Sequence, residues 1–156
     1  MSELSIVINC CFFNTDELKS YLLSLNGITS VEVIDIDELL RLHIKYDNNL
    51  ITCNIIKLEI QAFINELNYS VIFEFDKYSK EKLNTYEILL DYVCCEYCYA
   101  SSIEEMFDTV GIEKVTSNFY QKHFKREYKE DKYKIIVNYN PKLVTLDKIK
   151  EIEKDI

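Results

Sequence analysis

The sequence predicts an α+β protein made of two tandem βαββαβ modules, the element order of the ferredoxin-like fold. The first half of the chain alternates strand-like and helix-like runs in this order. The second half repeats the first at nearly constant spacing. Each copy opens with a pair of cysteines where a strand is expected to turn into a helix. We therefore expect antiparallel sheets with helices packed on one face.

In the first half, four runs have the β-branched or alternating composition of strands, and two have apolar residues at helical spacing. Leu18, Leu22 and Leu25 recur on one side of the first expected helix. Asn26 and Gly27 end that helix, because glycine readily adopts the left-handed conformation of a C-terminal cap. The expected strands are 4–8, 30–34, 40–46 and 71–75, and the expected helices are 15–25 and 52–67.

The second half restarts the pattern after a polar stretch but has no evident fourth strand. In a ferredoxin-like sheet this absence leaves an open edge, which the linker, the other half or a second chain would cover. A homodimer is one of these arrangements. The expected elements are a strand at 90–93, a turn at 94–98, a short helix ended by Gly111, a long hairpin over 115–128 and 133–139, and a last helix capped by Thr145.

Two offsets relate the halves, and they indicate an internal duplication. At an offset of 84, Cys10, Cys11, Gly27, Ile28 and Val31 correspond to Cys94, Cys95, Gly111, Ile112 and Val115. At an offset of 93, Tyr46, Leu50, Thr52, Ile56 and Lys57 correspond to Tyr139, Leu143, Thr145, Ile149 and Lys150. The nine additional residues (93 − 84) lie in the second hairpin, where an insertion costs little loop entropy. We therefore predict a module at 1–76, a linker at 77–86 and a module at 87–156.

Composition and charge exclude several classes of function. A net charge of −9 makes nucleic acid an unfavourable partner, because phosphate repels an acidic surface. No run reaches the roughly 20 apolar residues of a membrane helix, and no signal segment is evident, so we expect a soluble cytoplasmic protein without membrane insertion. The sequence contains no glycine-rich phosphate loop and no nucleophile with an evident histidine base. We therefore expect that the protein is not an enzyme.

The six cysteines point to metal or thiol chemistry rather than to a disulfide scaffold, because adjacent cysteines bond each other only with strain. Three of them, Cys94, Cys95 and Cys98, lie within five residues at the expected start of a helix, where the helix dipole favours thiolates. Two thiolates suit Cu(I), and a third moves the preference toward Zn(II) or Cd(II). The first copy offers a weaker set, which consists of Cys10, Cys11 and Asn14.

These motifs resemble the heavy-metal-associated (HMA) domain family of metal chaperones and metal-pumping P-type ATPases. In that family a Cys-x-x-Cys loop leads into a helix, and a Gly-Val turn follows fourteen residues after the second cysteine. Here Cys98 precedes Ile112, and Asn14 precedes Ile28, by the same fourteen residues. The loops 46–52 and 139–145 match the family's Tyr-Asp-Pro-like loop, and Asn68-Tyr69 stands at its Gly-Tyr.

The sequence also departs from the family pattern. Neither copy has the family's Gly-Met before the cysteines, and the first copy has Asn14 in place of the second cysteine. The doubled cysteine resembles a zinc-preferring variant of the family that has Cys-Cys-x-x-Glu.

The resemblance implies a protein that buffers a thiophilic ion through a Cys-Cys-x-x-Cys loop. It also implies a chaperone-like transfer of the ion to a metal-transport ATPase or another metal-accepting protein. One alternative is a tandem ferredoxin-like module for protein contacts, in which the cysteines are vestigial. A lesser alternative is a thiol redox protein, because thioredoxins also place Cys-x-x-Cys between a strand and a helix.

Overall fold

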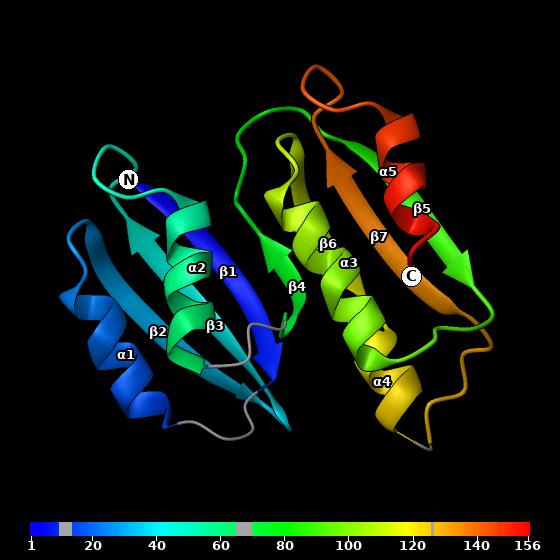
Figure 1. Cartoon of the computed structure of the whole chain (residues 1–156), viewed down its shortest axis with the longest axis horizontal. Helices are drawn as coiled ribbons and strands as arrows, with labels where there is room; N and C mark the ends of the chain where they lie inside the picture. The colour runs from blue at the N-terminus through cyan, green and yellow to red at the C-terminus, as the bar shows by residue number, and fades with distance from the viewer. Residues whose placement is uncertain (10–13, 65–69, 126) are drawn as a thin grey trace.

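The computed structural model describes residues 1–9, 14–64, 70–125 and 127–156, which form a mixed α/β fold (Figure 1). Seven strands make one sheet in the order β2-β3-β1-β4-β6-β7-β5, and all of its pairs are antiparallel. The strands are β1 (Ser2–Asn9), β2 (Ile28–Ile36), β3 (Leu39–Tyr46), β4 (Ile72–Asp76), β5 (Asn84–Leu90), β6 (Ile112–Ser117) and β7 (Tyr133–Tyr139). The helices are α1 (Thr15–Ser24), α2 (Cys53–Ile64), α3 (Glu96–Asp108), α4 (Phe119–Phe124) and α5 (Leu146–Glu153).

The first half has the predicted order β-α-β-β-α-β, with its strands arranged β2-β3-β1-β4. The helices α1, α2, α3 and α5 lie over the same face of the sheet (Figure 1). Side chains alternate along a strand, so Leu4, Ile6 and Ile8 of β1 share one face of the sheet, and all three are buried. Within the described ranges, no helix combines the length and apolar character needed to cross a membrane.

The two glycines occupy the same local geometry in the two halves. Gly27 and Gly111 have positive φ angles of 103° and 102°. A Cβ atom on Gly27 would lie 2.9 Å from Leu50 Cβ, and one on Gly111 would lie 2.9 Å from Leu143 Cβ. Only glycine satisfies both demands without strain, which explains why the chain's two glycines stand at these equivalent turns.

The second half differs from the prediction at its first strand. β5 spans Asn84–Leu90, whereas the sequence suggested 90–93, and it begins inside the range expected for the linker. The reason is that Ile88 is fully buried in the core, while Glu87 pairs with Lys134 of β7, Oε2 to Nζ 3.4 Å. Residues 91–95 form no strand and carry the chain toward α3.

A helix replaces part of the predicted second hairpin. The range 115–128 was expected to be one strand, but β6 ends at Ser117 and α4 follows. Phe119 determines this change, because its ring stacks on Tyr99 of α3 with centroids 3.9 Å apart and is only 1% exposed. The connection between β6 and β7 therefore contains a helix that anchors aromatic side chains in the core.

The sequence predicted a separate sheet for each half, but the structure has one continuous sheet. β4 pairs with β6 through Phe75↔Val115 and Asp76↔Lys114, and the last pair also forms an ion pair of 3.5 Å. β4 is the outer strand in the first-half order β2-β3-β1-β4, so its free edge is available to β6 of the second half. Buried residues of both halves consequently belong to one hydrophobic core cluster.

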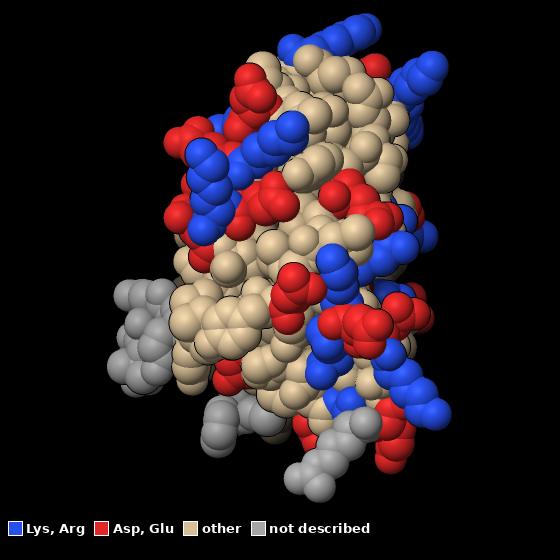
Figure 2. Space-filling model, turned by 90° about the vertical axis from the view of Figure 1, so that its right-hand side faces the viewer, with Lys and Arg blue, Asp and Glu red and all other residues tan. Residues whose placement is uncertain are grey.

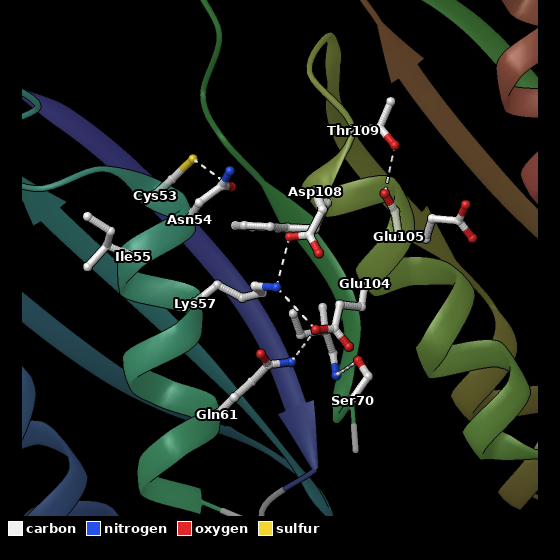
Figure 3. A network of polar contacts seen from close by, with 12 residues as sticks. Cys53, Asn54, Ile55, Lys57, Gln61, Ser70, Glu104, Glu105, Asp108 and Thr109 are labelled. Atoms are coloured by element: carbon white, nitrogen blue, oxygen red, sulfur yellow. Dashed lines mark hydrogen bonds and ion pairs between the residues drawn. The ribbon is translucent and has the colours of Figure 1, made fainter. Parts of the chain in front are cut away.

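A polar network also connects α2 to α3 across the junction (Figure 3). Lys57 Nζ lies 3.1 Å from Glu104 Oε1 and 2.8 Å from Asp108 Oδ1, and the lysine side chain is only 4% exposed. Gln61 Nε2 donates a further hydrogen bond of 2.8 Å to Glu104 Oε1. These contacts satisfy a buried charge from two carboxylates, as a buried lysine requires.

Candidate metal centre

The cysteine cluster lies where the chain enters α3. Cys95 is the N-cap residue of that helix, with an extended backbone, and its Sγ accepts a hydrogen bond from the backbone N–H of Cys98 at 3.4 Å. Cys98 follows in the first turn, and its Sγ lies 3.4 Å from that of Cys95. Cys94 precedes the helix and is exposed, whereas the other two are half-buried.

The three sulfurs are close enough to surround one ion. The Sγ atoms of Cys94, Cys95 and Cys98 all lie within 4.8 Å of one another. Thiolates on a tetrahedral Zn²⁺, with Zn–S of about 2.3 Å, would be about 3.8 Å apart. In the part of the chain that the structure describes, no other group of three His, Cys, Asp or Glu residues has this arrangement. The donor set therefore fits a thiophilic ion.

The protons of the cluster are unevenly distributed. The backbone N–H of Cys98, followed by the Cys98 side chain, lowers the pKa of Cys95 below its ordinary value of 9.0. The hydrogen bond with Cys95, followed by desolvation, raises the pKa of Cys98 to about 11. We infer that Cys95 carries the first thiolate and that Cys98 retains the proton, because the N–H bond already favours charge on Cys95. Metal binding would have to displace the Cys98 proton.

The turn of the first copy is only partly visible. Cys10 and Cys11, which the sequence suggested as a weaker set, lie outside the described residues. Asn14 is described, and its Oδ1 accepts hydrogen bonds from the backbone N–H groups of Asp16 at 2.9 Å and Glu17 at 3.2 Å. This side chain caps α1, so its amide oxygen is already engaged by the helix.

The structure also reveals a polar cluster that sequence reasoning missed. Ser5 Oγ lies 2.9 Å from His43 Nδ1 and 2.8 Å from the hydroxyl of Tyr78. Ser5 and His43 are direct partners in the register of β1 and β3, and a sequence alone does not give this register. The cluster attaches the loop after β4 to the sheet. Cys53 lies apart from the cysteine cluster, half-buried in the first turn of α2.

Comparison with known proteins adds little beyond these observations. No family model matches the chain, and no curated protein matches it. One similar solved structure is the solution structure of the N-terminal soluble domains of Bacillus subtilis CopA. It is 17% identical, with 99% of this chain and 90% of that chain covered, at a TM-score of 0.29. A TM-score this low does not establish a shared arrangement.

Proposed function

We propose that this protein binds one thiophilic metal ion through Cys94, Cys95 and Cys98. The observation that carries the proposal is the approach of the three sulfurs to within 4.8 Å at the start of α3. Cys95 is poised as a thiolate, and the helix N-terminus stabilises the negative charge that the ligands acquire. Three thiolates favour Zn(II) or Cd(II), whereas Cys95 and Cys98 alone would suit Cu(I).

The role that fits this site is buffering or transfer rather than catalysis. Cys94 is exposed, so a thiolate of another protein could replace it at the ion without unfolding the helix. Such exchange would deliver the ion to a metal-transport ATPase or another metal-accepting protein. We also infer that the chain consists of two tandem HMA-like ferredoxin modules. The shared glycine turns and the strand order β2-β3-β1-β4 support this division.

The test is a competitive titration of the fully reduced protein with Zn(II) and with Cu(I). We expect about one ion per chain, lost in Cys95→Ser/Cys98→Ser and retained in Cys53→Ser, which changes a cysteine outside the centre. Equal affinity of the wild type and the double variant for both metals would overturn the proposal. In that event the cysteines are vestigial, and a protein-interaction module is the better interpretation. A second ion that survives in the double variant would assign a further site to Cys10 and Cys11.

One observation favours a second candidate, a dithiol redox protein. The Cys95 and Cys98 sulfurs are 3.4 Å apart, and their pKa values are shifted in opposite directions, as in a reactive dithiol. Cys94→Ser separates the candidates, because a redox pair needs only Cys95 and Cys98. Metal binding through three thiolates predicts a weakened Zn(II) affinity in this variant, whereas a redox function predicts an unchanged reduction potential and metal affinity.

A further inference from the structure

The end of the sheet at β5 differs from its counterpart in the first half. β1, which corresponds to β5 in the repeat, is paired on both sides, with β3 and with β4. Among the described residues, β5 pairs only with β7, and it forms the last strand of the sheet. Figure 2 looks onto the side of the molecule where β5 and α5 lie, and it shows acidic and basic side chains mixed with uncharged surface. This end therefore presents no field of a single sign that would repel an identical surface.

β5 also lacks the features that normally protect an edge strand. It pairs with β7 over all seven of its residues without a register shift, and it contains no proline. Its only charge, Glu87, is paired with Lys134. The opposite edge, β2, has a register shift near its start and carries Glu32 and Asp35, which are the expected defences against pairing.

We propose that β5 pairs antiparallel with β5 of a second copy of this chain, around a two-fold axis at Ile88. In this register Glu87 lies opposite Leu89 of the second copy, and Asp91 lies opposite Thr85. An axis one residue earlier would place Glu87 against itself, and an axis one residue later would place Glu87 against Asp91. Of these three positions of the axis, only Ile88 gives a register in which no two acidic side chains lie opposite each other.

The exposed edge supplies suitable side chains for this contact. Ile88 points into the core and is fully buried, so Leu89 projects from the opposite face of the sheet, where it is 50% exposed. In the dimer each Leu89 gains a neighbour across the new ladder. The two helical layers lie on the same side of the joined sheet, because the two-fold axis is perpendicular to the sheet.

The dimer keeps the metal centres apart. Cys94 lies six residues beyond Ile88 in each copy, in opposite directions. Only Leu89 and Leu90 of these six residues continue the strand, so at about 3.4 Å per residue the two chains leave the joined ladder at points roughly 14 Å apart and then diverge. Dimerisation therefore does not depend on a shared ion, and its failure would leave the proposed metal site untouched.

The experiment is sedimentation velocity of the reduced, metal-free chain over a wide range of concentration. We expect a reversible dimer for the wild type. Leu89→Glu should raise its Kd by roughly tenfold or more, since it creates two acid–acid contacts per dimer and removes apolar burial. Ile34→Glu on β2 makes the same change at a 39% exposed residue of the other edge, and it should dimerise as the wild type does.

A positive charge in place of the negative one at residue 89 provides a second test. Leu89→Lys places a cation opposite Glu87 of the second copy, so this variant should retain the dimer that Leu89→Glu loses. Circular dichroism would verify that each variant is folded. Leu89→Glu should fold, because residue 89 lies opposite Lys134 of β7, whose positive charge accommodates a carboxylate. A monomeric wild type, or a dimer equally sensitive or insensitive to Leu89→Glu and Ile34→Glu, would show that β5 is not the interface.

Discussion

At the scale of single residues, Cys95 is the most informative side chain of the protein. It caps α3 with its sulfur, and the hydrogen bond from the backbone N–H of Cys98 that makes this cap also lowers its pKa. A serine at this position would preserve the cap but not the soft ligand. In the proposed function, one residue therefore joins helix initiation to metal binding.

This role predicts the order in which the thiols react. As pH rises toward the ordinary thiol value of 9.0, Cys95 should be alkylated by iodoacetamide first, because its pKa is lowered. Cys98, with its pKa raised to about 11, should follow later, as should Cys53, whose pKa burial raises. Mass spectrometry of the alkylated peptides measures this order, and Zn(II) should suppress the reaction at Cys95 but not at Cys53. Equal rates at the three cysteines would contradict the assignment.

The sequence was sufficient to identify these candidate ligands, but not their protonation. Spacing alone placed Cys94, Cys95 and Cys98 together, because the three thiols lie within five residues at the expected start of a helix. The distribution of the proton depends on which backbone N–H points at which sulfur, and that follows only from the position of the helix start. For the same reason the sequence alone does not show that Asn14 accepts the backbone N–H groups of Asp16 and Glu17 as the cap of α1.

At the scale of elements, local patterns predicted most helices and strands of the first half. The predictions were wrong where contacts between residues far apart in the sequence determine the secondary structure. α4 forms because the ring of Phe119 stacks on that of Tyr99, although aromatic residues in isolation favour strands. β5 begins at Asn84 because β7 provides a partner for all of its seven residues, and no local signal announces that ladder.

The glycine turns provide a prediction at this scale. Gly111→Ala should lower the free energy of unfolding by about 1–3 kcal/mol, because alanine disfavours positive φ and its Cβ would press on the Cβ of Leu143. Gly27→Ala should have a comparable effect, since the contact with Leu50 is equivalent. Urea unfolding followed by circular dichroism measures both. A loss at only one glycine would argue against equivalent turns.

At the scale of the whole molecule, the main feature is the fusion of both halves into one sheet. The sequence pattern predicted two separate sheets, but the pairing of β4 with β6 depends on two strand edges that meet in space. α3 reinforces the junction because it packs on β4 as well as on β6. The ion network around Lys57 closes the helical layer above the same junction.

Lys57 connects the two halves of the molecule, whereas Lys150, which corresponds to it at the offset of 93, does not. Lys57 is buried between two carboxylates of α3, whereas Lys150 is exposed and its Nζ lies 6.0 Å from the ring centroid of Tyr86. Lys57→Ala should lower the free energy of unfolding by about 1–3 kcal/mol, because Glu104 and Asp108 lose their cation while they remain partly covered. Lys150→Ala, the matched control, should change it by less than about 0.5 kcal/mol.

Urea unfolding of the two alanine variants tests this difference. Lys57→Met extends the test, because methionine restores the apolar packing of the lysine stem without its charge. If the ion pairs hold α2 against α3, Lys57→Met should remain less stable than the wild type. Recovery of full stability in Lys57→Met would show that packing alone maintains the junction, and equal losses in Lys57→Ala and Lys150→Ala would remove the special role of the buried lysine.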